Sequence, residues 1–125
     1  MGIAIGHDGI ILFHKNYELE NRYHDIYDTV QKLIKQYDAD VLVENPIGKQ
    51  QIISETIIRM ATYHMDKSIY VIHPATAKRL ILGKVKDKKA ATIEFAKNFV
   101  ENATQHESDA ILNYYGFLEK DKKVG

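Results

Sequence analysis

Three side chains able to bind a divalent metal ion stand at two places where folds commonly build sites. Glu44 ends the β-branched run Val41–Glu44, which predicts a buried strand. His106 and Asp109 are three residues apart at the start of a helical segment, so they share one helix face. Open α/β sheets place ligands at the carboxyl ends of their strands. The sequence between Glu44 and His106 also contains a basic segment, His73 to Phe99. Together with this segment, the three residues indicate a divalent-metal phosphodiesterase site.

Each of these residues also has a purely structural explanation. Glu44 could simply be a partly exposed glutamate at a strand end, capped by the following loop. Asp109 would complement the dipole at a helix start, where His106 or Ser108 could serve as the cap. The His-x-x-Asp spacing alone is therefore a weak signal.

The first part of the chain predicts an α/β architecture. The Asp8-Gly9 pair between two short apolar runs predicts an antiparallel hairpin. Two buried strands joined by a helix should lie parallel, with a right-handed crossover. The expected elements are the hairpin strands Gly2–Gly6 and Ile10–Phe13, a helix from Tyr23 to near Asp38, a strand Val41–Glu44, a helix Gln50–Met65 and a strand Ile69–Ile72.

The rest of the chain predicts helices around a basic loop. We expect a short helical turn after Pro74, a lysine-rich loop at Gly83–Asp87, a helix Lys88–Val100 and a last helix Glu107–Lys120. Residues 1–120 are expected to form a single domain, and 121–125 a flexible tail.

The composition limits which metal ions and partners the chain can be expected to bind. The 125 residues include no cysteine, so a metal must bind oxygen or imidazole ligands, which favours a hard divalent ion. No apolar run predicts a membrane span or a secretion signal, and the expected location is cytoplasmic. Basic and acidic residues balance at 17 each, but the segment from His73 to Phe99 has seven basic against two acidic residues, a net charge of +5. Such a segment fits either a solvated surface or a phosphate-binding surface.

The order of these features resembles the RuvC-type Holliday junction resolvases, which are RNase H-like nucleases. The resemblance spans nearly the whole chain. It rests on the hairpin, the first helix, Val41-Leu42-Val43-Glu44, His73-Pro74, Lys78, Gly83, Lys89 and His106-Glu107-Ser108-Asp109-Ala110. It implies a mixed sheet, an antiparallel hairpin plus parallel strands, flanked by helices.

The resemblance also implies roles for particular residues. Glu44, His106 and Asp109 would be metal ligands for Mg²⁺, with Mn²⁺ as a substitute, and Lys89 would act as a catalytic lysine at the phosphate. Lys78, Arg79, Lys84, Lys86 and Lys88 would bind DNA. The implied substrate is a four-way DNA junction, and its approximate two-fold symmetry implies a homodimer with two sites.

The chain departs from the family pattern in three places. Val85 and Asp87 stand where the family has a glycine and a small residue, and Ile47 stands where bacterial members have an aromatic residue. The first central strand, which carries a metal-bridging aspartate, is missing. Asp8 is a poor replacement, because it occupies the hairpin turn and leaves room for only one more strand before Tyr23. We therefore expect weak or absent cleavage, whether the reading frame starts too late or the chain is a natural fragment.

Three other functions stay open. The chain could be a catalytically dead module that binds junctions, a related nuclease that acts on structured RNA, or a small α/β domain whose polar residues are all structural.

Overall fold

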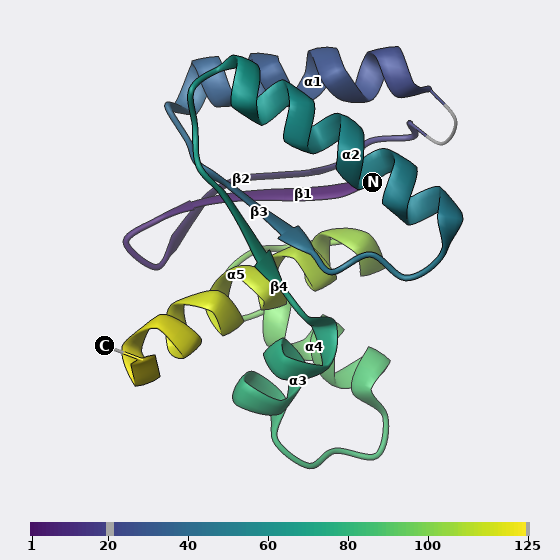
Figure 1. The fold of residues 1–125 in the computed structure, drawn as a ribbon. Helices are drawn as coiled ribbons and strands as arrows, with labels where there is room; N and C mark the ends of the chain where they lie inside the picture. Colours follow the sequence, from purple (N-terminus) through teal and green to yellow (C-terminus); the bar gives the residue numbers. More distant parts are fainter. Residues whose placement is uncertain (20–21, 125) are drawn as a thin grey trace. The chain divides into compact units, whose positions relative to one another are not determined.

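The structure, a computed structural model, describes residues 1–19 and 22–124. These residues divide into two compact units. The first unit contains Met1–Glu18 and the chain from Ile72 onward, and the second contains Leu19–Val71. In chain order the elements are β1 (Gly2–His7), β2 (Ile10–Asn16), α1 (Tyr23–Tyr37), β3 (Val41–Glu44), α2 (Lys49–His64), β4 (Ile69–Ile72), α3 (Pro74–Leu82), α4 (Lys88–Ala96) and α5 (Gln105–Val124), all labelled or traceable in Figure 1.

In the first unit, β1 and β2 form the predicted antiparallel hairpin. His7 pairs with Ile10, which leaves Asp8 and Gly9 as a two-residue turn. Both turn residues have positive φ angles, 50° and 80°, as a type I′ turn requires. The Asp8-Gly9 pair therefore has the structural role that its sequence predicts.

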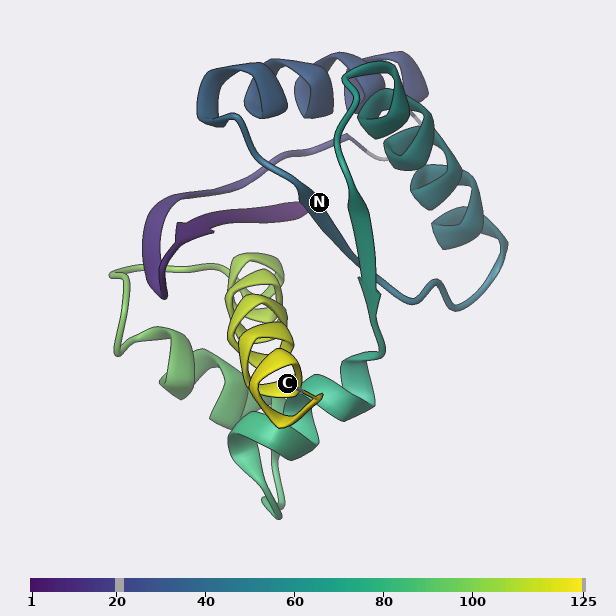
Figure 2. The same cartoon turned by 60° about the vertical axis from the view of Figure 1, so that its left-hand side comes forward.

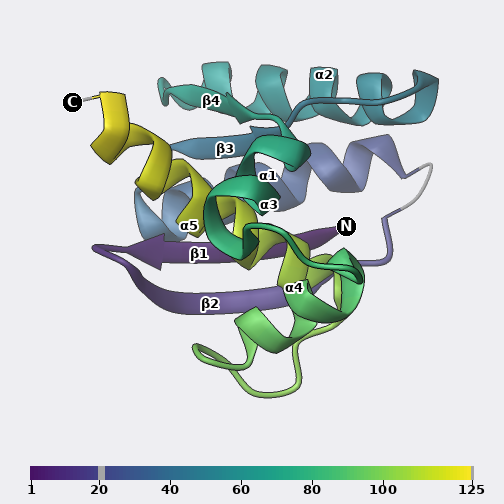
Figure 3. The same ribbon diagram turned by 90° about the horizontal axis from the view of Figure 1, so that it is seen from below.

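Helix α5 packs on one face of the hairpin, as Figure 3 shows from below. Alternate residues of a strand share a face, and Gly2 and Gly6 of β1 both lie against α5. A Cβ atom on Gly2 would collide with the His106 backbone, and one on Gly6 would collide with the Tyr114 ring. Glycines on this face thus let the strand and the helix approach closely.

Two tyrosine hydroxyls of α5 hold the hairpin turn. The backbone N–H of Gly9 donates to the Tyr114 hydroxyl at 3.0 Å, and the Tyr115 hydroxyl donates to the Gly9 carbonyl at 2.7 Å. Burial, with a smaller contribution from Tyr114, raises the pKa of Tyr115, so this hydroxyl keeps its donor proton. Both polar backbone groups of Gly9 are therefore held by α5.

Helices α3 and α4 pack against α5, and Figure 2 looks almost along α5 with these two helices below it. The buried side of α5 includes Ile111, Leu112 and Gly116. A Cβ atom on Gly116 would lie 2.8 Å from the Ala77 Cβ and 2.9 Å from the Ala77 Cα. The small residues at this crossing set how closely α3 and α5 approach.

We expect Gly116→Ala to destabilise the protein although alanine favours helices. The added methyl group must push the α3 backbone away from α5, and such overpacking costs about 1–3 kcal/mol, more than the ~1 kcal/mol that alanine gains over glycine in a helix. Urea unfolding followed by circular dichroism measures the change. Ala110→Gly, at a half-buried position of the same helix, is the control for the helix-propensity contribution. An unchanged or higher midpoint for Gly116→Ala would show that α3 shifts without cost.

The second unit consists of a helix pair and a strand pair. Helix α1 has the predicted apolar stripe, with Ile26, Val30, Leu33 and Ile34 buried, and it packs on α2. Asp38 ends α1 in the left-handed conformation, with φ of 52°. Strands β3 and β4 form a parallel pair and have the predicted bounds. The predicted α/β fold class is therefore confirmed.

Several details differ from the expectations. Strand β4 is more exposed than a buried strand should be, because Tyr70 and Val71 both reach the surface. The segment after His73 is a full helix, α3, because Pro74 fits the first helical turn and the His73 side chain accepts a hydrogen bond from the Ala75 N–H. The fourth helix ends at Ala96, after which residues 97–99 form turns.

The sheet and the end of the chain also differ. The strands form two sheets of two, and within residues 1–19 and 22–124 no ladder joins them. Helix α5 continues to Val124, so residues 121–124, expected in a flexible tail, are helical, while Gly125 lies outside the described residues. The expectation of a single domain over residues 1–120 stays a prediction. No helix of the described segments combines the length and apolar character needed to cross a bilayer.

Candidate functional site

Glu44 lies in the second unit, as the last residue of β3. Its side chain is exposed, and Asn45 and Pro46 follow it directly. Pro46 lacks an N–H group and cannot extend a ladder, so the strand ends where the carboxylate emerges. Glu44 thus occupies the predicted position at the carboxyl end of a parallel pair.

His106 and Asp109 lie in the first unit, in the first two turns of α5. They are one turn apart, with His106 exposed and Asp109 half-buried. The side-chain amide of Gln105 donates to Asp109 Oδ1 at 3.1 Å. The carboxylate is therefore oriented by its own helix and still reaches solvent.

The cap of α5 is neither His106 nor Ser108, the two residues that the structural alternative considered. Thr104 is the cap: its Oγ1 accepts from the Glu107 N–H at 3.2 Å, and Glu107 Oε2 accepts from the Thr104 N–H at 3.1 Å. This reciprocal pair is a capping box, which satisfies two backbone donors at once. The helix consequently starts at Gln105, two residues before the predicted start at Glu107.

Thr104→Ala should destabilise the protein by about 1 kcal/mol, because the helix loses its cap hydrogen bond. Thr104→Ser keeps the hydroxyl and should retain most of the stability. Chemical unfolding of the three proteins measures both changes. Equal losses in the alanine and serine variants would contradict a capping role for the Thr104 hydroxyl.

A buried glutamate and a half-buried histidine, neither of them predicted as a functional residue, form a pair beside the two candidate ligands. Glu107 is only 5% exposed, and its Oε1 pairs with Nδ1 of His14 on β2. Burial raises the pKa of Glu107, but the hydrogen bonds from His14 and Thr104 outweigh it and hold that pKa below its usual range. Glu107 is therefore a buried carboxylate stabilised in its charged form.

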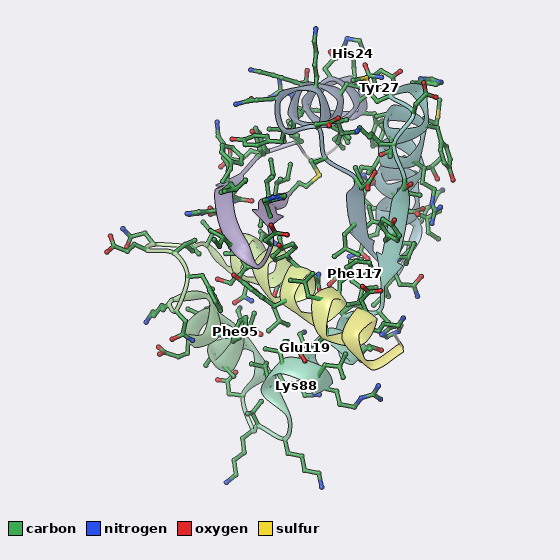
Figure 4. The ribbon with its side chains drawn as sticks, turned by 90° about the vertical axis from the view of Figure 1, so that its left-hand side faces the viewer. His24, Tyr27, Lys88, Phe95, Phe117 and Glu119 are labelled. Carbon is green, nitrogen blue, oxygen red and sulfur yellow. The ribbon has the colours of Figure 1, made fainter. Side chains whose placement is uncertain are left out.

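The basic residues lie on α3, on the loop after it and at the start of α4. Lys78 is half-buried, and the others of the predicted set are exposed: Arg79, Lys84, Lys86, Lys88 and Lys89. Gly83 has a φ of 65° where α3 ends, and Asp87 caps α4 through the Ala90 N–H at 3.0 Å. Figure 4 labels Lys88 at this end of the unit. Within the described part of the chain, none of the six cations forms an ion pair.

The three predicted metal ligands fall in both units, with Glu44 in the second and His106 and Asp109 in the first. Across residues 1–19 and 22–124, no group of three or more histidine, aspartate and glutamate side chains is arranged to hold a metal ion. A site formed by all three ligands stays a prediction.

Comparison with known proteins identifies the fold. No model of a protein family matches the sequence, and no curated protein matches it. Thermus thermophilus RuvC aligns with 98% of this chain and 87% of its own, with a TM-score of 0.71 at 12% identity. T. thermophilus RuvC in complex with a Holliday junction substrate aligns with 91% of this chain and 81% of its own, with a TM-score of 0.69 at 10% identity. The chain has a RuvC-like fold.

The RuvC-like fold agrees with the resemblance found in the sequence. The match extends over nearly the whole chain, so it includes the hairpin, the parallel pair and α5. At 10–12% identity, similarity to RuvC establishes the fold alone. The roles of individual residues are therefore part of the proposal below.

Proposed function

We propose that this protein is a metal-dependent, structure-selective endonuclease that cuts DNA phosphodiester bonds at branched junctions. The observation that carries the proposal is the RuvC-like fold, one example of which is RuvC with a Holliday junction substrate. The strand-end glutamate and the helical His-x-x-Asp stand on the elements for which the sequence predicted them. The cytoplasmic location predicted from the sequence is part of this proposal.

Glu44, His106 and Asp109 would hold Mg²⁺, and Mn²⁺ could replace it. Their donors suit such ions, since hard divalent cations prefer carboxylate oxygens and Mn²⁺ accepts imidazole as well. All three side chains reach solvent, as ligands of an exchangeable ion must. The bound ion would supply Lewis acidity and charge neutralisation at the scissile phosphate.

The basic residues would bind the phosphate backbone. Lys89 would neutralise charge that develops on the scissile phosphate. Lys78, Arg79, Lys84, Lys86 and Lys88 would hold neighbouring phosphates, since they form no ion pair with any described residue and their charge can meet an anionic partner.

Ile47 would contribute to junction recognition. It is 68% exposed in the loop between β3 and α2, three residues after Glu44. An exposed apolar side chain so close to the proposed ligand could wedge between base pairs, although it cannot stack as an aromatic ring does.

A homodimer would supply two sites to the two-fold symmetric junction. The outer side of α2 supports this part of the proposal, because Ile52, Met60 and Tyr63 are all exposed there. Residues Ile53 and Ile57 of the same helix are half-buried. Sedimentation of the wild type and of Met60→Asp tests whether this surface joins two copies.

One observation favours a second candidate, a module that binds junctions without cutting them. Among the described residues, none of the six predicted cations forms an ion pair, and five of them are exposed, so they can bind an anionic partner whether or not a metal is held. The decisive test compares binding and cleavage of a four-way junction, a linear duplex of the same sequence and a structured RNA, with Mg²⁺ and with Mn²⁺. Glu44→Gln and Asp109→Asn serve as controls.

Cleavage of the junction that both substitutions abolish supports the endonuclease. Tight junction binding without cleavage supports the binding module, and preference for the RNA indicates an RNA-processing nuclease. Equal, weak binding to all three substrates would contradict both functions and leave a structural α/β domain.

A further inference from the structure

The first turn of α5 is fastened to the hairpin more firmly than a capping box requires. Glu107 uses one carboxylate oxygen for His14 on β2 and the other for the Thr104 N–H. Gly2 on β1 lies against the His106 carbonyl, where no larger residue fits. Both strands of the hairpin thus contact the turn that carries His106.

Stability alone is a poor explanation for this arrangement. A buried carboxylate is costly to desolvate, and a packed apolar pair is often as stable or more stable. The same turn also holds buried polar atoms without partners in the described part of the chain, namely Gln105 Oε1 and Ser108 Oγ, and Asn16 Oδ1 on β2 is a third. Each such atom costs about 1–3 kcal/mol. Buried polar groups that cost stability in this way are often found at functional sites.

Glu107 lies between the two candidate ligands in the sequence but is not equipped to be one. Its side chain is buried, and both its oxygens already accept hydrogen bonds within the unit. His106 and Asp109, on either side of it, reach solvent. What Glu107 fixes is the helical turn from which these two side chains project.

We propose that Glu107 and His14 are positioning residues that hold the first turn of α5 on the hairpin and thereby preorganise His106 and Asp109 for a divalent cation. The inference rests on the proposed metal-dependent function. Partners that orient metal ligands are worth about ten- to a hundred-fold in metal affinity. Glu107 and His14 would act through the backbone of one helical turn, and Gln105 would orient Asp109 directly.

Mn²⁺ binding to the full chain, followed by the electron paramagnetic resonance signal of the free ion, tests the inference. The variants are Glu107→Gln, His14→Gln and Asp109→Asn. The matched control is Tyr115→Phe, which removes a hydrogen bond from the same helix to the same hairpin but at the Gly9 turn. Circular dichroism and urea midpoints establish that each protein is folded and how far each is destabilised.

We expect Glu107→Gln and His14→Gln to weaken Mn²⁺ binding about ten-fold or more, and Tyr115→Phe to change it less than two-fold at comparable loss of stability. Amide exchange should speed up at residues 104–109 in the first two variants and not in the control. If Asp109→Asn loses Mn²⁺ while Glu107→Gln and His14→Gln bind like the wild type, the positioning role is wrong and the metal site stands. A wild type that binds no Mn²⁺ overturns the metal-dependent function, and this inference with it.

Discussion

Glu107→Ala is expected to lower the free energy of unfolding by about 3 kcal/mol, because two donors lose their acceptor at about 1–3 kcal/mol each. The substitution removes the acceptor for His14 and for the Thr104 N–H and leaves a space beside the hairpin. The loss lies toward the low end of that sum because the His14 side chain is 26% exposed and can regain water. Urea unfolding at pH 7 measures the loss. Glu101→Ala, which removes an exposed glutamate just before α5, should change stability by less than about 0.5 kcal/mol.

The stabilisation that Glu107 contributes should decrease as the pH falls. Its pKa in the folded state lies below the ordinary glutamate value of about 4.3, so the folded state binds its proton less readily than the unfolded state does. The stabilisation is therefore present above about pH 5 and is lost as pH falls through the folded pKa. Unfolding curves between pH 7 and pH 3 should show the wild type and Glu107→Ala converging in acid. A constant difference across that range would mean that the carboxylate charge contributes nothing.

Local signals in the sequence predicted most of the elements. The Asp8-Gly9 turn is specified by two residues that tolerate positive φ, and the α1 stripe by apolar side chains at helical spacing. The bounds of β3 and β4 were predicted because Pro46 and Pro74 follow them closely. These features need no knowledge of distant contacts.

The features that were not predicted depend on partners far along the chain or, for the start of α5, on a capping box. His14 and Glu107 are 93 residues apart, and neither residue's neighbours in the sequence indicate the other. The capping box was visible, since Thr104 and Glu107 have its spacing, and recognising it would have placed the start of α5 correctly. The exposure of β4 depends on which surfaces cover it, which periodicity does not report.

The candidate site was likewise predictable from local pattern only in part. The placement of Glu44 at a strand end and of His106 and Asp109 on one helix face follows from local pattern. Whether the three converge on one ion depends on tertiary geometry, which no spacing in the sequence specifies. The hydrogen bond from Gln105 to Asp109 was predictable in part. Residues four apart on a helix are neighbours, but the spacing does not say that the Gln105 amide donates to the Asp109 carboxylate.

Replacing the loop lysines should weaken junction binding on the order of a hundred-fold, if each phosphate contact contributes about 1 kcal/mol. The variant combines Lys84→Ala, Lys86→Ala and Lys88→Ala, three exposed cations that pair with no acidic group in the described part of the chain. Each neutralised phosphate releases counterions, so the slope of log affinity against log salt should become less steep by about 2.7. Fluorescence anisotropy with a labelled four-way junction at several salt concentrations measures both quantities.

The matched control removes the same charge elsewhere, with Lys32→Ala, Lys35→Ala and Lys120→Ala, three exposed lysines on α1 and α5. Both triple variants change the net charge from zero to −3, so any general electrostatic effect is equal in the two. A loss confined to the loop variant locates the phosphate contacts on the segment between α3 and α4 and the start of α4. Equal losses in both variants would show that net charge alone governs binding, which removes the basis for assigning this loop to DNA.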